Sequence, residues 1–213
     1  MDTNILKVYK DLGLNYVSRE TCVYLENYIE LILKENKTLN IISRRNDNTS
    51  YLRERHIIDS MQIVDFVDFN QKKIIDFGSG SGFPGIILAI VAKFKGSETK
   101  IVMYEKSYRK CQFLKKTSAT LKLKTEIIQK NIYSEKDKSE MTITSRAFKP
   151  LPVILDIAEK NFQNYKNIIL FMGKSGKKIL KETLCDWDLS YEIKDSITNK
   201  ESFILNIMSA KRV

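Results

Sequence analysis

The amino-acid sequence predicts an α/β fold: a Rossmann-like, mostly parallel sheet of seven strands with helices on both faces. Three observations predict it. Apolar strand-like runs alternate with helix-like segments after residue 70, a glycine-rich loop follows the first run, and the last two runs have no helix between them. Because that final pair lacks a crossover, we expect it to form an antiparallel hairpin at the C-terminal edge of the sheet.

The first 70 residues predict helices rather than strands. From Ser18 to Lys37 apolar residues recur at helical spacing, and the first of these residues can cap the helix. Residues 36–48 are polar and irregular, which predicts a loop, and residues 50–66 predict a second helix. We therefore expect residues 1–70 to form a helical N-terminal extension. It packs on a core of residues 71–213, the two making one structural domain.

Strand-like and helix-like hydrophobic patterns that alternate along the chain predict the core. Strands are expected at residues 73–77, 100–104, 125–129, 140–145, 166–172, 187–193 and 202–209. Helices are expected at residues 84–94, 107–121, 150–164 and 174–182. Seven strands that end in a hairpin are the layout of class I methyltransferases, whereas a dinucleotide-binding domain continues the strand–helix alternation to its end.

The loop after the first strand bears most directly on function. It reads D-x-G-x-G-x-G from Asp76 to Gly82, and Pro84 and an apolar run follow. Glycine permits positive φ and close approach of a ligand, and proline suits the first helical turn. Such loops bind nucleotide-containing ligands outside the carboxyl end of the strand. Because Gly80 to Gly85 also satisfies G-x-G-x-x-G, this pattern alone leaves NAD open as the ligand.

Two acidic residues bear on the choice of ligand. Asp76 ends the first strand, where a carboxylate suits the sulfonium and amino groups of S-adenosylmethionine (SAM) better than a pyrophosphate, which prefers helix N–H groups and positive charge. Glu105 ends the second strand, where it can accept hydrogen bonds from both ribose hydroxyls of an adenosine. Dinucleotide-binding proteins use an acid at this place too, so Glu105 supports adenosine without choosing the cofactor.

Bulk properties restrict the class of protein. The chain has 213 residues, 43% of them hydrophobic, and a formal net charge of +10. That charge favours a polyanionic partner, although scattered lysines are commonly just solvated surface. No apolar run approaches the roughly 20 residues of a membrane span, and the N-terminus lacks a signal pattern. Three separated cysteines show no metal-binding spacing and predict a reducing, cytoplasmic setting. We expect a monomer without a metal.

The sequence resembles the RsmG (GidB) family of 16S ribosomal RNA guanine-N7 methyltransferases over about residues 20–182. The glycine loop carries part of the resemblance, and the other parts are Asn40-Ile41 with Arg55–Ser60, Glu105–Lys110 with Phe113-Leu114, and Thr144–Phe148. There are also departures: the family usually has Thr where Ile42 stands, often Gly-Arg at residues 130–131, and commonly Lys where Met172 stands. Lys174 is a candidate replacement for that last lysine.

The resemblance implies methyl transfer from SAM to a guanine N7 in 16S ribosomal RNA or the small ribosomal subunit. The N7 lone pair is already exposed, so no general base is required, and catalysis would rest on positioning and electrostatics. Arg146, at the end of the fourth strand, is the candidate that clamps a phosphate or stacks on the target base; His56 is a second candidate and also suits a structural pair with Asp59. The expected cofactor-binding residues are Asp76, Gly78, Ser79, Gly80, Gly82, Phe83, Glu105, Asn131, Ile132 and Arg146.

Clustered basic residues predict where RNA binds. The first candidate is an arginine cluster, because guanidinium groups suit phosphate oxygens, and the second is a lysine-rich helix. These residues are Arg44, Arg45, Arg53 and Arg55, then Lys174, Lys177 and Lys178. Two alternatives stay open: a SAM-dependent methyltransferase of another RNA, a protein or a small molecule, and a non-catalytic RNA-binding module with a vestigial loop.

Overall fold

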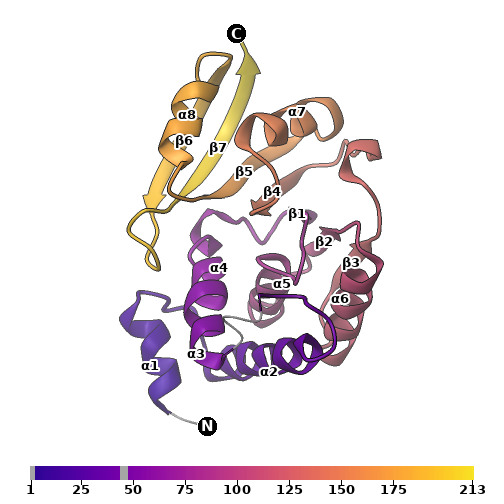
Figure 1. The fold of residues 1–213 in the computed structure, drawn as a ribbon, viewed down its shortest axis with the longest axis vertical. Helices are drawn as coiled ribbons and strands as arrows, with labels where there is room; N and C mark the ends of the chain where they lie inside the picture. Colours follow the sequence, from indigo (N-terminus) through magenta and orange to yellow (C-terminus); the bar gives the residue numbers. More distant parts are fainter. Residues whose placement is uncertain (1–2, 44–47) are drawn as a thin grey trace.

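The computed structural model describes residues 3–43 and 48–213, which fold around one seven-stranded sheet with the order β3-β2-β1-β4-β5-β7-β6 (Figure 1). The strands are β1 (Lys73–Phe77), β2 (Lys100–Tyr104), β3 (Thr125–Ile128), β4 (Met141–Arg146), β5 (Tyr165–Met172), β6 (Trp187–Asp195) and β7 (Phe203–Arg212). β1 to β5 pair in parallel, and β7 lies antiparallel between β5 and β6. The predicted fold class, including the C-terminal hairpin, is confirmed.

Helices cover both faces of the sheet. Those after the glycine loop are α5 (Gly85–Phe94), α6 (Tyr108–Thr120), α7 (Leu151–Asn161) and α8 (Gly176–Thr183). Alternate side chains of β1 enter different hydrophobic clusters: Ile74 packs with α5 and α6, whereas Ile75 and Phe77 pack with α7 and α8. This period of two separates a core layer on each side of the sheet.

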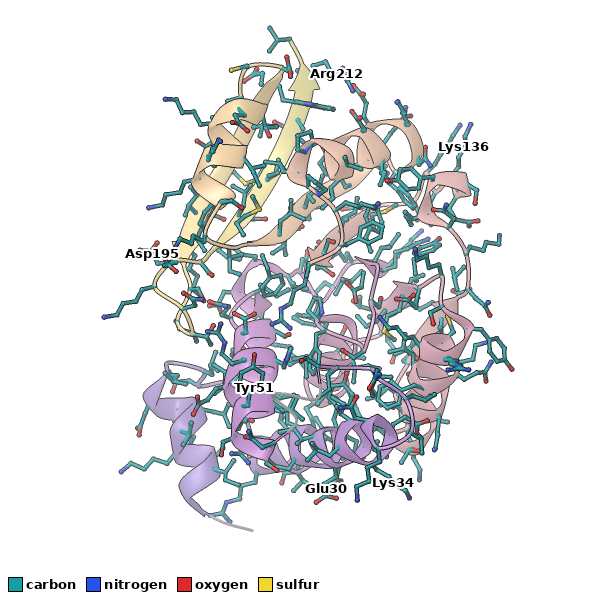
Figure 2. The ribbon with its side chains drawn as sticks, in the orientation of Figure 1. Glu30, Lys34, Tyr51, Lys136, Asp195 and Arg212 are labelled. Atoms are coloured by element: carbon teal, nitrogen blue, oxygen red, sulfur yellow. The ribbon has the colours of Figure 1, made fainter. Side chains whose placement is uncertain are left out.

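The N-terminal residues add a helical layer over α5. The helices are α1 (Thr3–Asp11) and α2 (Arg19–Asn36), and α1 was not predicted. Ser18 caps α2 as expected, since its hydroxyl accepts a hydrogen bond from Thr21 N. The apolar side of α2 is buried with Ile86 and Ile87 of α5 in one cluster. Figure 2 shows Glu30 and Lys34 on the outer side of α2, where both are exposed.

The helix predicted for residues 50–66 is present as far as Met61, but it is not one regular α-helix. The chain forms α3 (Thr49–Leu52), a π-helical segment (Arg53–Ile58), α4 (Asp59–Met61) and a final 3₁₀ turn at Val64–Phe66. Hydrophobic spacing was compatible with a continuous helix because Ile57, Ile58 and Met61 are buried in either geometry. π-helical turns are rare and concentrate at functional sites, and this one carries Arg55 and His56 toward the end of β4.

No helix within the described ranges is long and apolar enough to cross a lipid bilayer.

Candidate active site

The carboxyl ends of the central strands open into a cavity of about 580 Å³. Ligand sites of α/β sheets lie at this edge, where the strand order reverses between β1 and β4. Its walls come from the glycine loop, the ends of β2 and β4, the turn after β3 and the N-terminal layer. The lining residues are Ile41, His56, Gly78–Ser81, Phe83, Tyr104–Lys106, Lys110, Lys130–Tyr133 and Arg146–Lys149.

Two glycines of the loop have positive φ and no room for a side chain. Gly78 has φ +70°, and a Cβ there would lie 2.2 Å from a ring carbon of Phe148. Gly82 has φ +100°, and a Cβ there would lie 2.6 Å from the Tyr28 hydroxyl. That hydroxyl donates a hydrogen bond to Ser81 O. Only glycine combines these conformations with such close neighbours, so the loop follows a fixed path that α2 supports from behind.

Glu105 joins the glycine loop to the end of β2. Its carboxylate accepts hydrogen bonds from Gly80 N at 2.9 Å and from Ser107 N at 2.7 Å. The side chain lies on the cavity wall and is largely buried. Two main-chain donors therefore fix the carboxylate at the cavity wall, and its remaining lone pairs suit the hydroxyls of a bound sugar.

Asp76 lies beneath the loop and outside the residues that line the cavity, so its predicted influence on the SAM ammonium group, through water or main-chain amides, stays a prediction. The carboxyl is fully buried, and Oδ2 accepts a hydrogen bond from Gly85 N at 3.1 Å. Burial raises the pKa of Asp76 to about 7, and the nearby Glu105 charge adds to that rise. The hydrogen bond from Gly85 N to Asp76 holds the start of α5 against the sheet. The contact is close, because a Cβ on Gly85 would lie 2.8 Å from Oδ2. Gly82 is likewise a loop-shaping residue behind the cavity wall.

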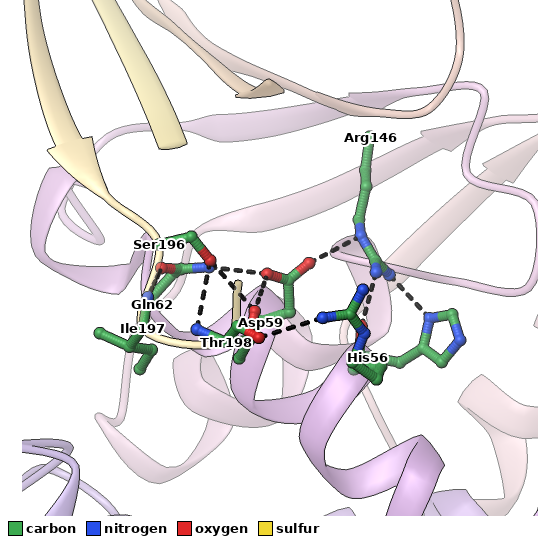
Figure 3. Close-up of polar contacts among 8 residues, drawn as sticks. His56, Asp59, Gln62, Arg146, Ser196, Ile197 and Thr198 are labelled. Carbon is green, nitrogen blue, oxygen red and sulfur yellow. Dashed lines mark hydrogen bonds and ion pairs between the residues drawn. The ribbon is translucent and has the colours of Figure 1, made fainter. Parts of the chain in front are cut away.

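Arg146 stands where the end of β4 meets the π-helical segment (Figure 3). Its Nε lies 3.0 Å from Asp59 Oδ2, Nη1 lies 2.8 Å from His56 Nδ1, and Nη2 donates to Arg55 O at 2.6 Å. The guanidinium also lies 5.9 Å from the Phe83 ring centre and 5.8 Å from that of Phe171. These five neighbours therefore fix its plane, with the charge balanced by Asp59.

His56 is a neutral acceptor in this arrangement. Arginine only donates, so Nδ1 accepts and Nε2 carries the proton. Burial, followed by the charges of Arg146 and Arg55, lowers the pKa of His56 to about 4. Its ring stacks on Phe83 with centres 4.9 Å apart. The predicted direct pair with Asp59 is replaced by a shared contact, because Arg146 lies between the two side chains.

The turn of the C-terminal hairpin holds Asp59 in place. Asp59 Oδ1 accepts hydrogen bonds from Thr198 Oγ1 at 2.7 Å and from Gln62 Nε2 at 2.8 Å. Gln62 Oε1 in turn accepts from Ile197 N, and Arg55 Nη1 donates to Thr198 O. These polar contacts (Figure 3) connect residues more than 130 positions apart. Sequence reasoning missed Gln62 and Thr198, since neither stands in a recognisable motif.

The cavity wall that is predicted to face adenine follows β3. Ile132 is buried, Asn131 caps the short 3₁₀ turn that begins there, and Tyr133 is exposed beside it. All three line the cavity, and contact of Asn131 and Ile132 with adenine stays a prediction. Tyr133 and the buried Tyr104 were missed, although both flank predicted residues in the sequence.

The predicted RNA-binding residues are divided by the structure. Arg44 and Arg45 lie outside the described residues. Arg53 needs correction, because its guanidinium forms a two-pronged ion pair with Glu26 and only 17% of its side chain is exposed. Arg55 donates a hydrogen bond to Thr198 O and also lines a second cavity. Lys177 and Lys178 of α8 are exposed, as is Lys174 just before this helix; Lys174 pairs with Glu201, and Lys178 pairs with Glu182.

Comparison with known proteins decides the family. Residues 21–208 match the family model described as "rRNA small subunit methyltransferase G". The chain belongs to this family. A "Ribosomal RNA small subunit methyltransferase G" from Pelagibacter ubique is 48% identical over 208 residues, covering 98% of each chain. The same-named protein from Rickettsia bellii (strain OSU 85-389) is 34% identical over 200 residues, covering 92% of this chain and 98% of the relative. The resemblance stated from the motifs is confirmed.

Solved structures agree on the fold. A SAM-dependent methyltransferase from Aquifex aeolicus aligns with a TM-score of 0.55 at 14% identity, covering 78% of this chain and 95% of that chain. A putative S-adenosyl-L-methionine-dependent methyltransferase from Methanococcus maripaludis aligns with a TM-score of 0.53 at 18% identity, covering 87% and 93%. In this chain, Met172 is buried and lines a second cavity together with Arg146. Lys174 is exposed and lines neither that cavity nor the first one.

Proposed function

We propose that this chain methylates N7 of a guanine in 16S ribosomal RNA, with SAM as the methyl donor. Family membership supports the enzyme class and the ribosomal RNA. One observation in the structure carries the proposal: a single cavity at the carboxyl edge of the sheet has the fixed Glu105 carboxylate on one wall and the Arg146 guanidinium on another. An adenosine donor and an RNA base can meet between them.

The lining residues fit SAM. The main chain of Gly78 to Ser81 forms one wall, Glu105 offers acceptors to ribose hydroxyls, and Asn131 and Ile132 flank the place for adenine. SAM supplies a methyl group activated by a sulfonium, whose carbon–sulfur electron pair leaves with sulfur when the N7 lone pair attacks the carbon. The chain contributes binding and orientation, so Arg146 would act as a positioning group and His56 as its neutral support.

The charge distribution at the cavity mouth supports RNA as the substrate. Lys106, Lys110, Lys130 and Lys149 line the cavity beside the residues already described. The lysines of α8 extend the positive surface, and Lys177 makes no ion pair within the described parts of the chain. Neutralising backbone phosphates with such lysines releases counterions and brings the nucleic acid to the site. We propose that Lys174, Lys177 and Lys178 contact RNA there, together with Arg55.

The protein is further proposed to act as a cytoplasmic monomer on 16S ribosomal RNA or the small subunit. The three free cysteines support a reducing compartment. Sedimentation of the purified protein tests the monomer: a dimer at micromolar concentration would contradict it.

Mass spectrometry of ribosomal RNA tests the proposed reaction. Cells without the gene should lack one 7-methylguanosine of 16S RNA, the parent gene should restore it, and Glu105→Ala should restore it poorly. Calorimetry should show the parent binding SAM and not NAD. Retention of every 7-methylguanosine would overturn the substrate, methylation of a protein or small molecule would favour another methyltransferase, and absence of SAM binding would favour a non-catalytic module.

A further inference from the structure

We propose that a second cavity, beside the first, receives the target guanine and that Arg146 recognises its O6 atom. This inference rests on the proposed function and deepens it. The second cavity measures about 330 Å³ and lies between the π-helical segment, the ends of β4 and β5, and the turn of the C-terminal hairpin. Its lining shares His56, Arg146 and Ala147 with the first cavity. The two cavities therefore meet at the Arg146 side chain.

The walls of the second cavity suit a flat, partly polar ring. Tyr51 and Phe171 are partly exposed and supply aromatic surface, which stacks on any base, whereas Phe203 is almost fully buried. On the hairpin side, Thr198, Asn199 and Ser202 supply polar groups. A volume of about 330 Å³ lies at the lower end of the range for small-ligand pockets, about 300–1,000 Å³. One base with its sugar is an appropriate occupant, whereas the first cavity has the room for the larger donor.

Arg146 retains hydrogen-bonding capacity for that occupant. A guanidinium has five N–H groups, and its contacts with Asp59, His56 and Arg55 O use one on each nitrogen. Within the described part of the chain, one N–H on each terminal nitrogen is left without a recorded partner. The residue that follows, Ala147, has φ +51° and lines both cavities. This left-handed turn is uncommon for alanine and ends β4 at the place where the two cavities join.

Donation to O6 would both select guanine and leave N7 free. Guanine carries the acceptor O6 next to N7, whereas adenine carries an N6 amino donor at that position. A group that only donates attracts O6 and repels the amino group, so Arg146 discriminates between the purines. N7 keeps its lone pair for the methyl group because the hydrogen bond goes to its neighbour. The ring becomes cationic on methylation, and the Asp59 partner offsets the Arg146 charge beside it.

Filling the second cavity tests the assignment. Ser202 lines the cavity, is half-buried and has no recorded side-chain hydrogen bond among the described residues. Ser202→Phe should lower kcat/KM for unmethylated small subunits at least tenfold, with the Kd for SAM within twofold of the parent. Ser209→Phe is the matched control, because Ser209 is exposed on β7 and lines neither cavity. The control should methylate at the parent rate. Methylation by Ser202→Phe within twofold of the parent overturns the assignment.

Nucleotide binding to the unmodified protein provides the second measurement. With S-adenosylhomocysteine saturating the first cavity, calorimetry should show GMP binding at least fivefold more tightly than AMP, and Arg146→Lys should remove the preference. If Ser202→Phe misfolds and loses SAM binding, this measurement on the parent protein still tests the assignment. It also separates the two proposals: a parent inactive on ribosomal RNA overturns the proposed function, while the GMP preference still upholds the guanine cavity. Equal binding of GMP and AMP overturns recognition of O6.

Discussion

Arg146 is the residue on which the site converges, because its guanidinium reaches the π-helical segment and lines both cavities. The motif Thr144–Phe148 pointed to it in the sequence. What the motif could not give is the set of partners, which come from residues 55, 56 and 59. At the scale of the residue, the site is therefore an arginine held in one orientation by groups far away in the chain.

Asp59→Asn should reduce catalysis more than binding. The carboxylate neutralises Arg146 and fixes Nε at 3.0 Å, so its loss leaves the guanidinium misplaced and a cation beside a ring that gains positive charge. We expect kcat to fall by about 10- to 100-fold, with the Kd for SAM nearly unchanged. Single-turnover methylation and calorimetry measure the two quantities. An equal loss of SAM affinity would contradict a positioning role and indicate general damage to the fold.

His56 should make the folded protein sensitive to mild acid. Its pKa in the fold is about 4, below the unperturbed value of 6.5, so the unfolded chain binds the proton first. The free energy of unfolding is then fully maintained above about pH 6.5 and falls toward pH 4. Urea denaturation of the parent and His56→Asn at pH 7, 6, 5 and 4 measures this difference. Other groups, including Asp76, titrate alike in both proteins. A constant difference across this range would contradict the neutral assignment.

At the scale of elements, a chain of buried amides crosses the sheet away from the site. Asn167 on β5 accepts from Thr142 Oγ1 on β4 at 2.5 Å and donates to Asn206 Oδ1 on β7 at 2.8 Å. It also donates to Phe66 O at 2.9 Å. The hairpin and the N-terminal layer are thus joined to the parallel sheet through one side chain. Asn167 therefore links β5 both to β7, which follows the hairpin turn that carries Thr198, and to the N-terminal layer.

Asn167→Ala should destabilise the fold by about 3 kcal/mol, because several buried polar groups lose their partner at once. The exposed Asn164→Ala is the matched control, since it loses only one long hydrogen bond to Lys138 O. Urea unfolding measures both free energies. Equal stability of the two variants would show that the buried amides carry no such energy.

At the scale of the whole molecule, the N-terminal layer and the core share one hydrophobic cluster. Tyr28, Ile29 and Ile32 of α2 pack in it with the fully apolar side of α5. We propose that residues 1–70 are an extension and residues 71–213 a core. The shared hydrophobic cluster supports the view that the two parts form one structural domain.

Deletion of residues 1–70 should abolish cooperative folding. The fragment 71–213 would expose the side of α5 that packs against α2, including Ile86 and Ile87, along with the back of the glycine loop beneath Tyr28. We expect it to aggregate or to lose its near-ultraviolet circular dichroism. A fragment that unfolds cooperatively and binds SAM would show instead that the core is an independent domain.

The sequence by itself determined the strands, the glycine loop, the acid at the end of β2 and the family. These features are encoded locally: period-two alternation, glycines where φ is positive, and short motifs at strand ends. The π-helical interruption, the inward turn of Arg53 onto Glu26 and the burial of Asp76 were decided by tertiary structure. So was the contact of Arg146 with Asp59 and of Asp59 with Thr198. Each depends on a charge or hydrogen-bond partner that only the folded sheet brings near, and sequence spacing carries no record of such a partner.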